Sequence, residues 1–188
     1  MTSDSLLFVT GNKNKFAEAQ SILKRVGITI EQYPTRPIEI QSNSLNEIAR
    51  DSCRKALLEA DQPLFVEDAG MFINHYNGFP GPYSSYVLHT ISNPGILKLM
   101  DGVKNRTAVF RSVIAYGAPK EEIRLFEGRT DGSISRRIRG THWGFDPIFI
   151  PKEGDGSTYS EMSTEMKNRI SHRAKSLAKF ANWLLEQS

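Results

Sequence analysis

The sequence predicts an α/β fold, because patterns typical of strands and of helices both occur along the whole chain. A strand, a turn and a helix open it, segments rich in β-branched and aromatic residues fill its middle, and an amphipathic helix closes it. The chain has 188 residues, of which 39% are hydrophobic and 24% charged, so we expect one domain over residues 1–188 with a sizeable core. The formal net charge of +3 is compatible with a phosphate ligand and with nucleic acid alike.

The first elements follow from an apolar run and a helical repeat. Residues 6–9 are apolar and lead into a turn that contains glycine, which is typical of a buried strand. Apolar positions at helical spacing predict a helix over residues 13–26, and a second strand is expected at residues 28–33. Two prolines favour an irregular loop over residues 35–42, because proline cannot donate a hydrogen bond to a neighbouring strand.

A helix, a strand and two loops are expected next. Ser44 and Glu47 form the pattern of a capping box, with an apolar helical face behind them. Residues 64–66 are apolar and predict a buried strand. Residues 78–82 are expected to form a turn or loop, and residues 92–95 a break between two short helices.

The second half of the chain is rich in strand patterns. Residues 107–116, 123–126 and 132–138 predict three consecutive antiparallel strands, and residues 148–150 a further one. A helix with Ser171 as candidate cap is expected to end the chain. The apolar stripe of this helix comprises Ala174, Leu177, Ala178, Ala181, Leu184 and Leu185.

The turn after the first strand is a candidate phosphate site. A glycine turn between a strand and a helix gathers backbone N–H groups at the positive end of the helix dipole. Thr10, Asn12 and Lys15 add a hydroxyl, an amide and an ammonium group. The spacing is not that of a P-loop. Similar turns occur in proteins that bind no phosphate, so the turn alone leaves both interpretations open.

Two adjacent carboxylates stand at the end of the strand predicted at residues 64–66. Neighbouring strand positions point to opposite faces, so only one of Glu67 and Asp68 can face a cleft. Carboxylate oxygens suit Mg²⁺, which typically binds one or two protein carboxylates together with substrate phosphates. A pair of solvated loop acids explains the same pattern. Glu39, in the predicted loop, by itself indicates a surface residue.

Aromatic and basic residues in the second half suggest a base-binding site or a nucleic-acid surface. Trp143 and Phe145 flank a glycine and could stack a base, although such rings also form cores. The basic run at residues 136–139 favours, as an alternative function, a single-stranded nucleic-acid binder. A nucleotide sensor that does not hydrolyse its ligand is another alternative. His172 and Arg173 can donate hydrogen bonds to a ligand or cap a helix.

The remaining reactive residues exclude several classes of protein. Four scattered histidines disfavour a zinc enzyme, and the single cysteine, Cys53, excludes an intramolecular disulfide and is best interpreted as a small buried residue. No segment approaches the roughly 20 apolar residues of a transmembrane helix, and the first residues lack the features of a signal peptide. We therefore expect a cytoplasmic protein without a membrane partner.

Five segments resemble, in chain order, the motifs of the inosine triphosphate pyrophosphatase family: residues 10–15, 67–70, 78–84, 144–147 and 171–173. The resemblance implies a long twisted mixed β-sheet flanked by helices, with two lobes and a central nucleotide cleft. It also implies a homodimer that, with Mg²⁺ as cofactor, hydrolyses deaminated purine nucleoside triphosphates (ITP, dITP, XTP) to the monophosphate and pyrophosphate. Nucleic acid is not an expected partner.

The resemblance also implies roles for individual residues. Asp68 would be the proton acceptor, Glu39 and Asp68 would bind Mg²⁺, and Lys15 would neutralise phosphate charge. Ala69 departs from the Ser or Thr that is common in the family, and Ser52 from a lysine, for which Arg54 or Lys55 would substitute. The implied substrate-binding residues are Thr10, Gly11, Asn12, Lys13, Asn14, Lys15, Ala69, Trp143, Gly144, Phe145, Asp146, Lys167, His172 and Arg173.

Overall fold

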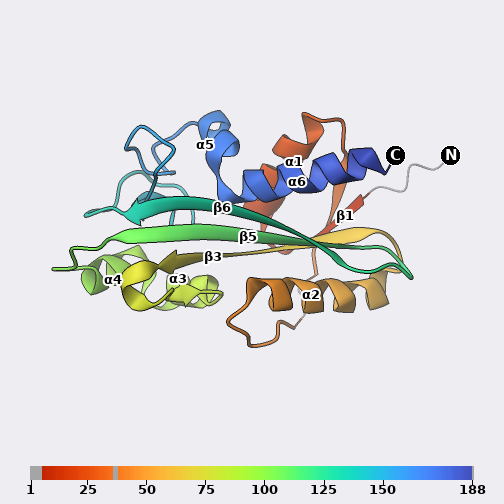
Figure 1. Cartoon of the computed structure of the whole chain (residues 1–188), viewed down its shortest axis with the longest axis horizontal. Coiled ribbons are helices and arrows are strands. Elements are labelled where there is room, and N and C mark those ends of the chain that lie inside the picture. The colour runs from red at the N-terminus through yellow and green to blue at the C-terminus, as the bar shows by residue number, and fades with distance from the viewer. Residues whose placement is uncertain (1–5, 36–37, 188) are drawn as a thin grey trace. The chain divides into compact units, whose positions relative to one another are not determined.

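The computed structural model describes residues 6–35 and 38–187, which form a mixed α/β fold (Figure 1). The sheet has seven strands in the order β2-β1-β3-β5-β6-β7, and β4 pairs with β3. Strand β1 is parallel to β2 and β3, whereas the pairs β3–β4 and β6–β7 are antiparallel. The strands are β1 (Leu6–Val9), β2 (Ile30–Tyr33), β3 (Leu64–Ile73), β4 (Pro80–Gly81), β5 (Thr107–Gly117), β6 (Arg124–Ile134) and β7 (Phe149–Pro151). The predicted α/β class and mixed sheet are confirmed.

The chain divides into two compact units, and β3, β5 and β6 contribute residues to both. The first unit comprises residues 1–68, 112–128 and 173–188, and the second comprises residues 69–111 and 129–172. Within the described part of the chain, no helix is long and apolar enough to cross a bilayer.

The first unit is built on a β-α-β-α-β chain path. Helix α1 (Lys13–Lys24) connects β1 to β2, and α2 (Leu45–Ala60) connects β2 to β3. Figure 1 shows α1 and α6 (His172–Glu186) on one side of the sheet and α2 on the other. The two crossovers cover opposite faces, as expected for right-handed connections that run in opposite directions across the sheet order β2-β1-β3.

Aromatic packing forms the core of the first unit beneath α1 and α6. The ring of Phe65 stacks on Phe8 at 4.4 Å and lies 5.0 Å from the ring of Phe180. Phe180 is fully buried in α6, whereas the predicted stripe residues Ala178 and Leu185 are exposed. The stripe was thus wrong at these two positions, because Phe180 rather than Ala178 faces the sheet.

The second unit contains three short α-helices: α3 (Ser84–Thr90), α4 (Ser92–Leu99) and α5 (Thr164–Ile170). Figure 1 shows α3 and α4 on one side of its part of the sheet and α5 on the opposite side. Short 3₁₀ turns occur at Asn74–Tyr76 and Asp146–Ile148. A buried apolar cluster that includes Phe110, Phe149 and Tyr159 forms the core.

Two predicted strand boundaries were wrong. Strand β3 continues to Ile73, so Glu67 and Asp68 lie inside the strand and not at its end. Strand β6 is one continuous strand where two were expected, at residues 123–126 and 132–138. Between the two predicted strands, the side chains of β6 alternate between buried and exposed, and Thr130 is fully buried. The polar residues there therefore belong to a regular strand and not to a turn.

Two expected breaks also take part in regular structure. Residues 92–95 were expected to separate two helices, but they form the first turn of α4. Proline is tolerated there because the first N–H groups of a helix have no partner within it. Within the loop predicted at residues 78–82, Pro80 and Gly81 pair with Phe72 and Met71 of β3.

Candidate active site

The carboxyl end of β1 is the point where the chain path changes direction in the first unit. Strand β2 lies on one side of β1 and β3 on the other, and the connecting helices leave on opposite faces. In open α/β sheets, ligands bind at such switch points beyond the carboxyl ends of the strands. The parallel register Phe8↔Phe65 aligns the two strands, and Thr10 and Glu67 each follow these residues by two positions. The glycine turn and the acidic segment of β3 thus meet here.

The turn that opens α1 is held by its own side chains. Asn12 is the N-cap, and its Oδ1 accepts hydrogen bonds from the backbone N–H groups of Asn14 at 2.9 Å and Lys15 at 3.2 Å. Thr10 Oγ1 accepts from the N–H of Asn12 at 3.1 Å. Asn12 therefore has a structural role as a cap that the sequence analysis did not assign, although asparagine before a helix is a common N-cap.

A buried cluster of charged side chains lies beside this turn. Lys15 Nζ is 3.0 Å from Glu67 Oε2 and donates to the main-chain oxygen of Glu67 at 3.0 Å. Arg173 Nε lies 3.3 Å from Glu67 Oε1, and Arg173 Nη1 pairs with Glu18. Ser112 Oγ donates to Glu67 Oε1 at 2.6 Å. Glu67 thus links Lys15 and Arg173 in one cluster of ion pairs.

Glu18 and Ser112 were not predicted as site residues, and Glu67 was assigned no role. One signal was available for Glu18: it follows Lys15 by three residues on α1, so the two side chains lie on one face of that helix. Ser112 gave no such signal, because it belongs to a different strand and meets Glu67 only through the sheet order β3-β5.

Asp68 has a different environment from Glu67 because alternate strand residues face opposite sides. Glu67 shares the face of Phe65, which packs against α6, and its side chain is only 1% exposed. Asp68 lies on the other face of β3, the face that α2 covers, and is half-buried. Asp68 is therefore more accessible than its neighbour.

The segment that contains Glu39 lies on the same side as α2. Lys55 of α2 donates to the main-chain oxygen of Ile38 at 2.7 Å and pairs with Asp51 at 2.7 Å. Glu39 itself is exposed. Lys55, expected as a substitute for a missing lysine, thus holds the chain next to Glu39.

These carboxylates suit a hydrated cation better than a fully coordinated one. In the residue ranges 6–35 and 38–187, no group of three or more His, Cys, Asp or Glu side chains is arranged to hold a metal. Mg²⁺ needs only one or two carboxylates when water and phosphate oxygens complete its shell. The side chains of Glu39, which is exposed, and of Asp68, which is half-buried, are more accessible to a hydrated cation than that of Glu67, which is 1% exposed.

A second group of predicted residues comes together in the second unit. Lys167 Nζ lies 2.6 Å from Asp146 Oδ2, and both side chains are nearly inaccessible to solvent. The same ammonium lies 5.4 Å from the ring centre of Trp143, within the range of a cation–π contact. Trp143 is half-buried, so its ring is the more accessible of the two predicted stacking rings.

The other predicted base-binding side chains of this unit are buried. Phe145 is 4% exposed and belongs to the apolar core. His172 is also 4% exposed, and its ring stacks on Phe110 with centroids 4.4 Å apart and planes 8° apart. Core packing thus fixes both residues in position.

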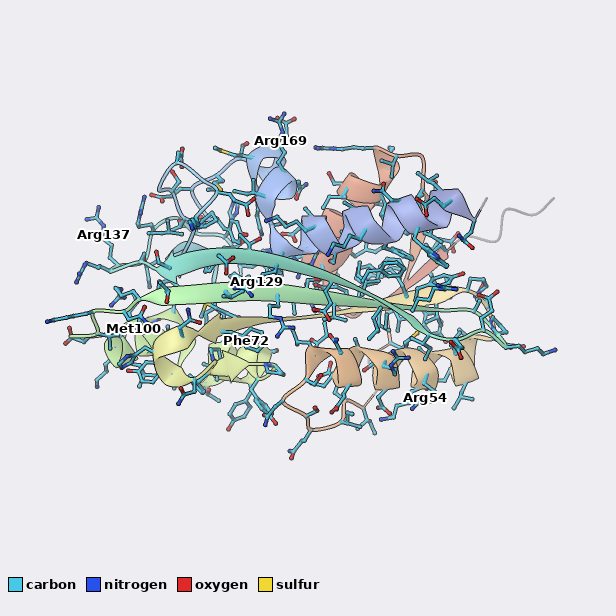
Figure 2. The ribbon with its side chains drawn as sticks, in the orientation of Figure 1. Arg54, Phe72, Met100, Arg129, Arg137 and Arg169 are labelled. Atoms are coloured by element: carbon cyan, nitrogen blue, oxygen red, sulfur yellow. The ribbon has the colours of Figure 1, made fainter. Side chains whose placement is uncertain are left out.

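The basic run at residues 136–139 lies in a loop beyond β6, which ends at Ile134, although a strand was expected over residues 132–138. Arg139 Nη2 lies 2.7 Å from Glu161 Oε2, and Arg139 Nη1 donates to the main-chain oxygen of Gly156. Arg137 is exposed, and its side chain points away from the ribbon (Figure 2). Arg139 therefore has a structural role, whereas Arg137 is exposed to solvent.

Known proteins share this architecture. Residues 6–183 match the model of the Ham1 family. A protein of Methanopyrus kandleri named dITP/XTP pyrophosphatase is 49% identical over 179 residues, covering 95% of each chain. One of the same name from Thermococcus kodakarensis is 47% identical over 182 residues, covering 96% of this chain and 97% of that protein. The solved structure of a HAM1 protein from Coxiella burnetii has a TM-score of 0.83 at 26% identity and covers 97% of this chain and 99% of that one. This chain belongs to the Ham1 family.

Proposed function

We propose that this protein hydrolyses deaminated purine nucleoside triphosphates, ITP, dITP and XTP, to the nucleoside monophosphate and pyrophosphate. Such a reaction removes damaged bases from the nucleotide pool. The observation that carries the proposal is the meeting of the Asn12-capped start of α1 with Lys15 and the acidic segment of β3 at the switch point of the sheet. Relatives at 47–49% identity bear the name dITP/XTP pyrophosphatase. We further propose that the protein works in the cytoplasm as a homodimer.

The phosphate-binding part of the site is assigned to residues 10–15. The N-terminus of α1 favours negative charge, and the ammonium of Lys15 neutralises charge that develops on the phosphate oxygens. Asp68 accepts a proton from the attacking water, because its carboxylate is accessible and lies on β3 next to this turn.

Mg²⁺ is the proposed cofactor, held by Asp68 and Glu39. Bound there, it would polarise phosphate oxygens and stabilise pyrophosphate as the leaving group. Both carboxylates are hard oxygen donors on accessible side chains, in keeping with a cation that retains several waters. Ala69, which follows Asp68, presents only a methyl group and its backbone to the substrate.

Base recognition is assigned to Trp143, Gly144, Phe145 and Asp146, together with Lys167, His172 and Arg173. Donors aimed at the 6-keto oxygen of hypoxanthine or xanthine would be left unpaired against the amino group of adenine, at a cost of about 1–3 kcal/mol each. Arg173 is held in one orientation by Glu18 and Glu67, which suits a residue that must distinguish a keto oxygen from an amino group.

A pyrophosphate-release assay tests this function. The full chain is incubated with ITP, XTP, dITP and the four standard ribonucleoside triphosphates, with and without Mg²⁺. The proposal predicts release from the three deaminated substrates, little from ATP, and loss of turnover when EDTA removes the metal. Binding without release would indicate a nucleotide sensor. Metal-independent binding of single-stranded nucleic acid that weakens steeply with salt, without turnover, would indicate a nucleic-acid binder.

A further inference from the structure

We infer that Glu67 is a positioning residue of the hydrolytic site, whose buried carboxylate fixes the ammonium of Lys15 and thereby controls the rate of the chemical step. The inference rests on the proposed function, because it assigns Lys15 to the phosphates. Glu67 faces the opposite side of β3 from Asp68, the proposed metal ligand. Glu67 acts through Lys15 and need not touch the substrate.

The contacts of Lys15 leave room for a ligand. Its Nζ has three N–H donors, of which one points to Glu67 Oε2 and one to the main-chain oxygen of Glu67, both at 3.0 Å. No other residue in the described part of the chain takes the third donor. The side chain of Lys15 is 19% exposed, whereas that of Glu67 is 1% exposed. Lys15 therefore stands at the boundary between the buried cluster and solvent.

Glu67 is itself fixed from two further directions. Ser112 Oγ donates to Oε1 at 2.6 Å, and Arg173 Nε lies 3.3 Å from the same oxygen. Ser112 in turn lies 2.9 Å from Ser176 Oγ, and both serines are fully buried. A carboxylate bound on both oxygens keeps one orientation, so it holds the lysine in one place.

Opposite charges alternate along the ion pairs of the cluster, from Lys15 to Glu67, to Arg173 and to Glu18. Lys15 and Arg173 contribute two positive charges, and Glu18 and Glu67 two negative ones. Without the charge of Glu67, Lys15 and Arg173 would both lose this buried carboxylate as an ion-pair partner. Lys15 would then lose its fixed position while its positive charge would be less neutralised.

This change affects turnover and substrate affinity differently. A displaced ammonium stabilises the transition state less well, because catalysis depends on donors that are already in place. The attraction of a less neutralised lysine for the triphosphate is not reduced. Glu67→Gln is therefore expected to lower kcat about 10- to 100-fold without raising KM. A merely structural defect that reduces the amount of folded protein would lower apparent kcat together with thermal stability.

A double-mutant cycle provides the test. Steady-state kinetics with ITP and Mg²⁺ are measured for the wild type, Lys15→Met, Glu67→Gln and the double variant. If Glu67 acts through Lys15, the double variant has the kcat of Lys15→Met alone. Effects on kcat that multiply, or an unchanged kcat in Glu67→Gln, would overturn the inference. Glu59→Gln, at an exposed position of α2, is the matched control and should retain wild-type kinetics.

Ser112→Ala keeps the test decisive if Glu67→Gln fails to fold, as judged by circular dichroism. This variant removes one hydrogen bond to Glu67 and no charge, and is expected to lower kcat about 2- to 10-fold at unchanged KM. A wild-type kcat for a folded Ser112→Ala would then contradict the inference. Absence of ITP turnover in the wild type would contradict the proposed function instead, so the two failures are distinguishable.

Discussion

The ammonium of Lys167 lies 2.6 Å from a carboxylate oxygen of Asp146, and the two side chains are only 6% and 7% exposed. The residues are 21 positions apart, on α5 and on the 3₁₀ turn before β7. Lys167 also lies 5.4 Å from the ring centre of Trp143 and 5.7 Å from that of Tyr159. Asp146 thus fixes the cation around which the proposed base-binding residues are arranged.

Removal of Asp146 is expected to destabilise the protein strongly. Asp146→Ala removes the carboxylate of a buried ion pair, which typically costs about 3–5 kcal/mol. Urea unfolding followed by circular dichroism measures the change in the free energy of unfolding. Glu165→Ala, at an exposed position of α5, should change it by less than about 0.5 kcal/mol. Similar stabilities for the two variants would show that the ion pair does not hold this region.

Gly70 is expected to tolerate no side chain. A Cβ atom added there would lie 2.3 Å from the main-chain oxygen of Gly81, which belongs to the paired strand β4. The obstacle is backbone, so Gly70→Ala must separate β3 from β4 and should lower the free energy of unfolding by about 1–3 kcal/mol. The melting temperature measures this effect. An unchanged value would mean that the two strands separate without cost.

The secondary structure that local patterns determine was predictable from the sequence, whereas long-range pairing was not. The apolar run before Gly11 and the helical repeat after it correctly predicted β1 and α1. The extension of β3 through Glu67 was not predictable from local preference, because two acids are unfavourable in a buried strand. The charge of Glu67 is compensated by Lys15 and Arg173, which lie 52 and 106 positions away in the sequence. Sheet order brings these residues together, and no spacing rule in the sequence encodes it.

Burial of the residues at the candidate site was harder to predict than the elements that carry them. Lys167 and Trp143, both expected at the base, lie in contact, and their role in base binding stays a prediction. The burial of Phe145 and His172 depends on packing against residues such as Phe110, which no local pattern identifies.

Cys53 is expected to be unreactive in the folded protein. Its side chain is fully buried, and burial raises the pKa of its thiol to about 12. Because this pKa exceeds the value of about 8.5 for a free cysteine, the stability linked to the protonated thiol is lost as the pH rises from about 8.5 towards 12. Iodoacetamide at pH 8.5, followed by mass spectrometry, should label the protein in urea and leave the native protein unmodified. Rapid native labelling with activity lost in proportion would contradict this expectation and indicate a catalytic role for Cys53.

Isotope labelling is expected to locate the bond that breaks. If water attacks the α-phosphorus, turnover of ITP in H₂¹⁸O places the label in the monophosphate, and pyrophosphate leaves unlabelled. Mass spectrometry of both products measures the distribution. Label in pyrophosphate would mean attack at the β-phosphorus and would require a different placement of the phosphates relative to Asp68.

The most direct measurement compares turnover and nucleotide binding in Asp68→Asn. Asparagine keeps the shape of the side chain but removes the charge and the proton-accepting carboxylate at a half-buried position of β3. ITP hydrolysis should fall at least about 100-fold, while ITP binding, measured by calorimetry, should remain within about tenfold of the wild type. Pyrophosphate release at the wild-type rate would contradict the assignment of Asp68 as the proton acceptor of the hydrolytic site.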